Sequence, residues 1–201
     1  MLIFEDKIKQ NKTDFVNKVN LIAENLNTNP NYLMALMYSE SRLNPAAQNL
    51  KFPLYNGPAT GLIQFTPDTA QILGTSIDQL KAMSNVEQLD FVYKYFLPFK
   101  GKLTDYFNTY MACFFPAAIG KPDYWIFETA KIKRTAVAKQ NPAIDLNQDG
   151  KITVAEFKSF LLKTIPAQFK NILFEVKEFL SDKKNIVTIV LIGAFILMLK
   201  K

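Results

Sequence analysis

The sequence contains no histidine and only one cysteine, and each shortage excludes a kind of chemistry. Without histidine the chain cannot form a Ser-His-Asp triad, and most zinc sites lose their usual ligand. Cys113 has no second cysteine with which to form an internal disulfide. It lies in an apolar run, so we expect a packed core thiol rather than a nucleophile, because no histidine is present to activate it.

Patterns typical of disordered, repetitive or nucleic-acid-binding proteins are also missing. The 201 residues contain no low-complexity tract and no internal repeat. The chain is basic, with 24 Lys and Arg against 18 Asp and Glu, but its lysines are scattered and do not alternate with aromatic residues. We therefore expect no nucleic-acid partner, and we expect anionic lipid or an anionic wall polymer as the acidic partner.

The two ends of the chain differ in their apolar content. The N-terminus lacks the long apolar stretch of a signal peptide, because acidic residues follow Phe4 at once. Residues 186–199 form an uncharged run between two pairs of lysines. As a helix this run spans about 21 Å, less than the ~30 Å hydrocarbon core, but flanking lysines can extend its reach. A buried core helix is the alternative; we expect a membrane anchor, because Thr188 is the only polar side chain of the run.

Helix-period apolar patterns divide the chain into four predicted pieces. A helical segment covers residues 1–28, and a mainly α-helical domain covers residues 29–140. A loop and a helix follow at 141–163, and residues 164–201 form an amphipathic helix and the apolar tail. Strand patterns are scarce, with room for one short hairpin in a long loop. Within the main domain we expect helices at 31–43, 67–73, 86–96 and 104–115 and this loop at 44–60.

One carboxylate lies on the apolar side of the first predicted helix of the main domain. Glu40 falls on the same helical face as three apolar residues before it: Leu33, Leu36 and Met37. A carboxyl group on a buried face loses hydration, which raises its pKa and retains a proton for donation to a glycosidic oxygen. The alternative is that Glu40 lies at the edge of the helix and pairs with Arg42 or a lysine.

Further motifs follow Glu40 in a fixed order. They are Glu40-Ser41, Asn44-Pro45-Ala46-Ala47, Gly61-Leu62-Ile63-Gln64 and Pro67-Asp68-Thr69-Ala70. This order resembles the soluble lytic transglycosylase (SLT) family of the lysozyme-like, goose-type superfamily. The family's pattern is a helix ending in Glu-Ser, a loop, Gly-Leu-Met-Gln and a Pro-x-Thr-Ala helix. The resemblance covers residues 28–128, and residues 115–122 resemble the third motif of its phage-borne branch.

The resemblance implies a lysozyme-like fold that cleaves peptidoglycan between N-acetylmuramic acid and N-acetylglucosamine. Glu40 would protonate the glycosidic oxygen and then act as a base on the sugar's own 6-hydroxyl, which closes a 1,6-anhydro ring. The family needs no catalytic cofactor and no second carboxylate, because the acetamido group of the substrate stabilises the cationic centre. The sequence agrees, since no Asp or Glu occurs from Ser41 to Pro67.

The resemblance also implies substrate-binding roles for neighbouring residues. Ser41 would support the glutamate, and Gln64 would form a hydrogen bond near it. Gly61 and Leu62 would let the backbone approach the sugar. A tight turn at Gly61 and an ordinary loop position for Gln64 are the alternatives. The family's third-motif tyrosine is missing here, and Tyr110 would either replace it or serve as a packed aromatic residue.

Residues 145–156 match the twelve-residue loop of an EF-hand-like calcium site. The ligands in this pattern are the side chains of Asp145, Asn147, Asp149 and Glu156 and the carbonyl of Lys151, with Gly150 at the sharp turn. We expect a structural Ca²⁺ ion with no part in catalysis. A solvated acidic turn without metal is the alternative. The helix before the loop is only weakly indicated, because Pro142 lies three residues before the loop.

These observations lead to one expectation and one alternative. We expect a membrane-tethered lytic transglycosylase, carried in a phage particle beside other virion proteins, that acts on the glycan strands of the host cell wall. The alternative is an inactive or hydrolytic lysozyme-like structural membrane protein of a virion. The intact residues Glu40, Ser41, Gly61 and Gln64 favour the enzyme.

Overall fold

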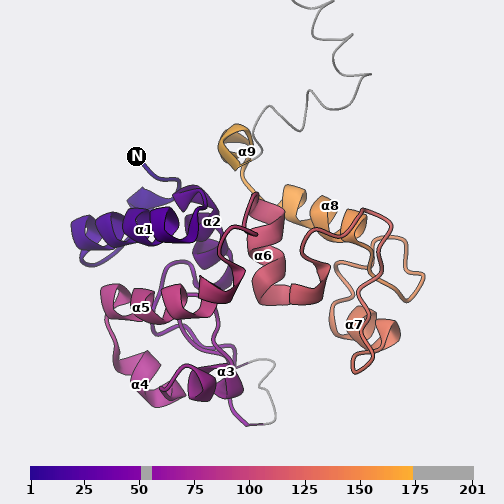
Figure 1. The fold of residues 1–201 in the computed structure, drawn as a ribbon, viewed down its shortest axis with the longest axis horizontal. Helices are drawn as coiled ribbons and strands as arrows, with labels where there is room; N and C mark the ends of the chain where they lie inside the picture. The colour runs from indigo at the N-terminus through magenta and orange to yellow at the C-terminus, as the bar shows by residue number, and fades with distance from the viewer. Residues whose placement is uncertain (51–55, 174–201) are drawn as a thin grey trace, which may run out of the picture. The chain divides into compact units, whose positions relative to one another are not determined.

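The computed structural model describes residues 1–50 and 56–173, and Figure 1 shows their arrangement. Contacts divide the chain into two units, Met1–Thr164 and Ile165–Lys201. The described part of the second unit contains the helix α9 (Ala167–Leu173). The predicted membrane anchor at 186–199 lies outside the described residues. None of the helices that the structure does describe has the length and apolar character needed to cross a membrane.

The first unit is built from helices. Its α-helices are α1 (Lys12–Leu26), α2 (Pro30–Ser41), α3 (Pro67–Ile72), α4 (Ile77–Ala82), α5 (Asn85–Phe96), α6 (Tyr106–Phe114), α7 (Arg134–Gln140) and α8 (Val154–Thr164). Its short 3-10 helices are η1 (Glu5–Lys7), η2 (Leu97–Phe99) and η3 (Pro116–Ala118). Residues 1–50 and 56–173 contain no strand, only isolated bridges such as that between Gln48 and Thr60. The prediction of a mainly α-helical protein is confirmed.

Polar residues fix the starts of the helices that carry the site. Asn29 caps α2 with its side chain, and Pro30 occupies the first helical position, where the missing N–H costs nothing. Ser84 and Glu87 form a reciprocal capping box at the start of α5. Asp105 caps α6. These local signals place three helix starts within two residues of the sequence-based prediction.

Helix α2 passes through the core of the first unit. It contacts α1 and α6, while α1 also contacts α5 (Figure 1). Residues 32–37 are all buried, so this part of α2 has no exposed face. After this buried stretch the last turn, with Tyr38, Ser39 and Glu40, becomes partly exposed before Ser41 is buried again. A helix buried on all sides therefore carries a carboxylate to the point where the core opens.

An aromatic cluster connects α6 with the chain that follows it. The ring of Phe157 in α8 stacks on Phe114 of α6, with centroids 4.9 Å apart, and lies 5.4 Å from Phe127. The Phe127 N–H donates to the Ile152 carbonyl at 2.8 Å, which joins the segment after α6 to the end of the acidic loop. The loop and α8 are therefore fixed to the same helix that supports the site.

Candidate active site

The Glu40 carboxyl group lies against α6. Its Oε1 accepts a hydrogen bond from the Tyr110 hydroxyl at 2.5 Å, and that hydroxyl also lies 3.2 Å from the Ser39 hydroxyl. Arg42 turns away, with its guanidinium 4.7 Å from the centre of the Tyr38 ring. None of the ion pairs found among the described residues involves Glu40. Among the described residues, Glu40 is therefore paired with neither Arg42 nor a lysine.

Burial determines the protonation of this site. It raises the pKa of the Glu40 carboxyl above its ordinary value, and the weaker, opposing effect is the hydrogen bond from Tyr110. Burial also raises the pKa of the Tyr110 hydroxyl well above its ordinary value, and the nearby Glu40 charge adds to that increase. Burial therefore shifts both groups toward their protonated forms.

Glu40 opens onto a cleft of about 620 Å³. Its described lining comes from the end of α2, the 63–64 turn, α6, residues 140–144 and α8. The lining side chains are Glu40, Ile63, Gln64, Tyr110, Cys113, Phe114, Gln140, Asn141, Pro142, Ala143, Ile144, Phe157 and Phe160. Glu40 is the only charged residue in this lining. Cys113 is half-buried at the cleft rather than enclosed in the core, and burial raises the pKa of its thiol, which keeps the thiol unreactive.

Ser41 supports the end of α2 without lining the cleft. Its hydroxyl lies 2.9 Å from the Met37 carbonyl oxygen and 3.0 Å from the Leu62 carbonyl oxygen, and its proton can serve either acceptor. The side chain is buried and does not line the cleft. The position suits the supporting role implied by the family resemblance, because it joins the end of α2 to the 61–64 turn.

Gly61 and Leu62 also lie behind the cleft, since both are buried and neither belongs to the described lining. Gly61 has a φ of +84°, and a Cβ atom there would lie 2.5 Å from Gln88 Oε1. The turn and this close approach account for the glycine without any sugar. Gln64 does line the cleft, and its Nε2 donates to the carbonyls of Gly61 at 3.1 Å and Ala47 at 3.2 Å.

Gln88 is a site residue that the sequence interpretation missed. Its side chain is fully buried, and its Oε1 accepts from the Leu62 N–H at 3.0 Å. Its Nε2 donates to the carbonyls of Pro45 and Leu80, both at 2.6 Å. Gln88 therefore holds together the chain after α2, the turn at Leu62 and the end of α4. The sequence did contain a signal for this role. Gln88 lies four residues before Val92, which places its amide on the apolar, buried face of α5.

The predicted calcium loop is closed by hydrogen bonds to its own backbone. Gly150 N–H donates to Asp145 at 3.0 Å, and the N–H groups of Leu146 and Asn147 donate to Glu156 Oε1 at 3.2 and 3.4 Å. Lys151 forms an ion pair with Asp149. In the described parts of the chain, no three His, Cys, Asp or Glu side chains are close enough to hold a metal. The donors of the motif are nevertheless all oxygens, which suit a hard cation such as Ca²⁺.

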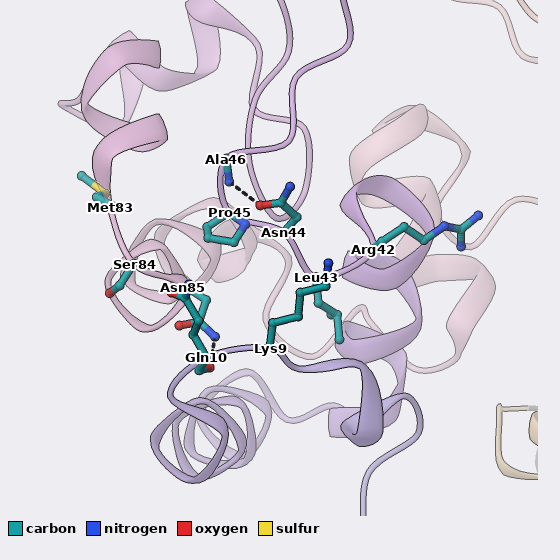
Figure 2. A pocket seen from close by; sticks show the side chains of 10 residues that line it. All are labelled: Lys9, Gln10, Arg42, Leu43, Asn44, Pro45, Ala46, Met83, Ser84 and Asn85. Atoms are coloured by element: carbon teal, nitrogen blue, oxygen red, sulfur yellow. Dashed lines mark hydrogen bonds between the residues drawn. The ribbon is translucent and has the colours of Figure 1, made fainter.

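A second, smaller cavity of about 240 Å³ lies between the N-terminal segment and the start of α5 (Figure 2). Lys9 and Arg42 border it. The Asn85 amide donates to the Gln10 carbonyl at 2.7 Å, so a main part of its polar edge is already paired. Glu40 is not among the lining residues, and the larger cleft is the better candidate for an active site.

Residues 18–90 match a family model described as Transglycosylase SLT domain. The matched segment contains Glu40, Ser41, the 61–64 turn and Gln88, whereas Tyr110 and the acidic loop lie beyond it. None of the curated proteins and none of the solved structures matches the chain. The match and the helical fold support a relation to lysozyme-like enzymes that cleave peptidoglycan.

Proposed function

We propose that this protein is a peptidoglycan lytic transglycosylase that uses Glu40 as its only catalytic acid and base. The observation that carries the proposal is the position of Glu40. Its carboxyl group opens onto the large cleft, burial favours its protonated form, and the described lining of the cleft contains no second carboxylate. A mechanism with two carboxylates has no partner here, which favours assistance by the substrate's acetamido group.

The proposed reaction cleaves the bond between N-acetylmuramic acid and N-acetylglucosamine without water. Glu40 donates its proton to the glycosidic oxygen as the bond to C1 breaks. The resulting carboxylate keeps the hydrogen bond from Tyr110, which stabilises the developing charge. Glu40 then takes the proton of the 6-hydroxyl while that oxygen bonds to C1. The products are a 1,6-anhydro sugar, a free 4-hydroxyl and a reprotonated Glu40.

Digestion of purified sacculi tests this proposal. We expect the protein to release 1,6-anhydro muropeptides, which mass spectrometry distinguishes from reducing-end products. Glu40→Gln keeps the acceptor oxygen for Tyr110 but cannot supply the proton, so the rate should fall by about 10²- to 10⁴-fold. Glu24→Gln makes the same chemical change on an exposed position of α1 and should leave the rate unchanged.

Three outcomes would contradict parts of the proposal. Reducing-end products alone would make the protein a hydrolase of the lysozyme kind. Equal digestion by the wild type and Glu40→Gln would remove Glu40 from its assigned role. Absence of digestion by the folded wild type would favour the alternative, a structural protein that has kept a lysozyme-like scaffold.

We also propose that residues 145–156 bind one structural Ca²⁺ ion. The side chains of Asp145, Asn147, Asp149 and Glu156 and the carbonyl of Lys151 would hold it. Support comes from the spacing of these residues and from their all-oxygen chemistry. The carboxylates presently accept hydrogen bonds from backbone N–H groups of the same loop, so binding requires some of these contacts to be exchanged. The ion has no part in the proposed proton transfers.

The setting that we propose is a membrane-tethered enzyme of a phage particle, with other virion proteins as neighbours. Its support is sequence alone: the apolar run at 186–199 and the phage-like pattern at 115–122. Flotation of the full chain with lipid vesicles tests the tether. Ile192→Lys, at the middle of the run, should abolish flotation, because a charge there costs about 2.5–3.5 kcal/mol. Asn185→Lys, in the flank, should leave it intact; flotation of both variants would contradict the tether.

A further inference from the structure

The part of the cleft lining from residue 140 onward comes from chain beyond the 18–90 match. We call it the downstream wall, and it consists of residues 140–144 with Phe157 and Phe160 of α8. We propose that the downstream wall is a specificity-determining subsite for one uncharged, N-acetylated sugar ring next to the bond that Glu40 acts on. This proposal rests on the proposed function and assigns to the accessory segment a direct part in binding substrate.

The charge of the cleft selects a neutral group. The chain carries 24 Lys and Arg, yet none of them belongs to the described lining. The peptide stems of peptidoglycan carry carboxylates, and a carboxylate that loses water at such a surface needs a cationic or strongly donating partner. The downstream wall offers no cation, only the neutral amides of Gln140 and Asn141. A sugar ring without its stem is therefore the part of the polymer that matches this side.

The side chains of the wall match both the apolar face and the polar edge of a sugar ring. A pyranose ring presents C–H groups that pack on apolar surfaces, while its acetamido group needs hydrogen-bond partners at the edge. Phe160 and Pro142 supply the apolar surface, and Gln140 and Asn141 supply amides. The Asn141 Nδ2 donates to the Val137 carbonyl at 2.9 Å, which fixes the orientation of that amide.

The α8 part of the wall packs against α6, which carries Tyr110. Phe157 stacks on Phe114 and meets the ring of Tyr110 edge-on, with centroids 5.8 Å apart. Tyr110 in turn donates to Glu40. Phe160 follows Phe157 by three residues on α8 and stays half-exposed at the cleft. One aromatic residue therefore anchors the wall, and the next one along the helix is available to the ligand.

A binding experiment in the Glu40→Gln background separates recognition from cleavage. The probe is the β-1,4-linked tetramer of N-acetylglucosamine, which carries no peptide, and its Kd is measured by calorimetry. We expect Phe160→Ala to raise Kd about tenfold or more. Phe160→Tyr keeps the aromatic ring, so its Kd should stay within about twofold of the parent value. Tyr124→Ala removes an 82% exposed aromatic side chain outside the cleft and should not change Kd.

Two further measurements keep the proposal testable if Phe160→Ala lowers the melting temperature. Gln140→Ala, at an exposed position, should raise Kd severalfold with an unchanged melting temperature. The deacetylated tetramer should bind the Glu40→Gln protein at least about tenfold more weakly than the acetylated one. No binding of the acetylated tetramer, or a Kd that neither variant nor deacetylation changes, overturns the proposal. Loss of digestion in Glu40→Gln would still stand in that case, so failure of the wall and failure of the chemistry are distinguishable.

Discussion

Tyr110 is the side chain that acts most directly on the proposed catalytic acid. Its hydrogen bond lowers the pKa of the Glu40 carboxyl, against the larger increase caused by burial. In Tyr110→Phe this bond is lost, so the pKa of Glu40 should rise further. The acid must be protonated at the start of the reaction, so the fall of kcat/KM on the alkaline side should move to higher pH.

The same substitution should also lower the maximum rate. The Glu40 carboxylate formed during the reaction loses a hydrogen bond to a charged group, worth about 1.5–3 kcal/mol and hence about ten- to a hundredfold in rate. A pH profile on soluble glycan fragments measures both effects. Tyr124→Phe, on an exposed tyrosine away from the cleft, is the control. If the alkaline fall of kcat/KM occurs at the same pH in Tyr110→Phe and the wild type, Tyr110 does not affect the pKa of Glu40.

Gln88 and Gly61 form a coupled pair behind the cleft. Gln88→Ala leaves the Leu62 N–H and two carbonyls without their buried partner, which should lower the free energy of unfolding by about 1–3 kcal/mol. Gly61→Ala should also destabilise, because its Cβ would lie 2.5 Å from Gln88 Oε1 and its φ is positive. In the Gln88→Ala background the collision disappears, so Gly61→Ala should cost less there.

Urea unfolding of the two single variants and the double variant measures this coupling. Residues in contact commonly show interaction energies of about 0.5–3 kcal/mol, and the sign expected here is a double variant less destabilised than the sum. Strictly additive losses would mean that the turn relaxes around the new methyl group. Ser159→Ala, at a half-exposed position of α8, is the control and should leave the free energy of unfolding nearly unchanged.

Among the elements, the acidic loop before α8 makes a separate prediction. If 145–156 binds Ca²⁺ in the folded state, the ion stabilises that state by about 2.7 kcal/mol when its concentration is a hundred times Kd. We expect a higher melting temperature in Ca²⁺ than in chelator. Glu156→Gln should remove most of this difference, because position 12 supplies the bidentate ligand.

Two controls make the calcium result specific. Asp78→Asn changes an exposed acid in the first turn of α4 and should leave the calcium effect intact. Mg²⁺ at the same concentration should stabilise less, because it prefers octahedral geometry and retains its water. A melting temperature that is the same in Ca²⁺ and chelator, measured on the wild type, would leave the loop as a solvated acidic turn.

The helix starts could be predicted from the sequence, because their signals are local. Pro30 and the Ser84 capping box mark helix starts that need no distant partner. The face of α2 is less readable, because residues 32–37 are buried all round and the apolar stripe predicted there is part of a uniformly buried surface. Glu40 reaches the cleft because the core ends at its turn, which depends on where α6 lies.

Long-range contacts account for what the sequence could not predict. Tyr110 meets Glu40 across 70 positions, and Gln88 meets Leu62 across 26. Neither pairing has a local pattern. The downstream wall was even less predictable from the sequence. Residues 140–144 and α8 read as an accessory segment around the predicted calcium loop, yet they line the same cleft as Glu40. The motif order singled out Glu40 as the candidate acid, and the side chains that surround Glu40 could be identified only from the fold.

The protein combines a basic net charge with a cleft whose described lining contains no cation. The formal net charge of +6 favours association with an anionic wall polymer, while the described cleft lining has Glu40 as its only charge. The proposed attraction to the polymer and the proposed recognition of a sugar would therefore use different surfaces. Added salt should weaken adsorption to sacculi by screening the basic surface, yet leave the Kd for a neutral saccharide nearly unchanged.

The buried acid also has a consequence for global stability. Because burial raises the folded-state pKa of Glu40 above its ordinary value of 4.5, its stabilising contribution is complete below that pH and is lost as pH rises through the folded-state pKa. Glu40→Gln carries no ionisable group there, so its stability relative to the wild type should increase over this window and then level off. Urea unfolding at several pH values measures the difference, and Glu24→Gln on the surface of α1 should show none. A stability of Glu40→Gln that instead falls relative to the wild type as pH rises would mean that the folded protein favours the ionised carboxylate, and the proposed acid would then lack its proton.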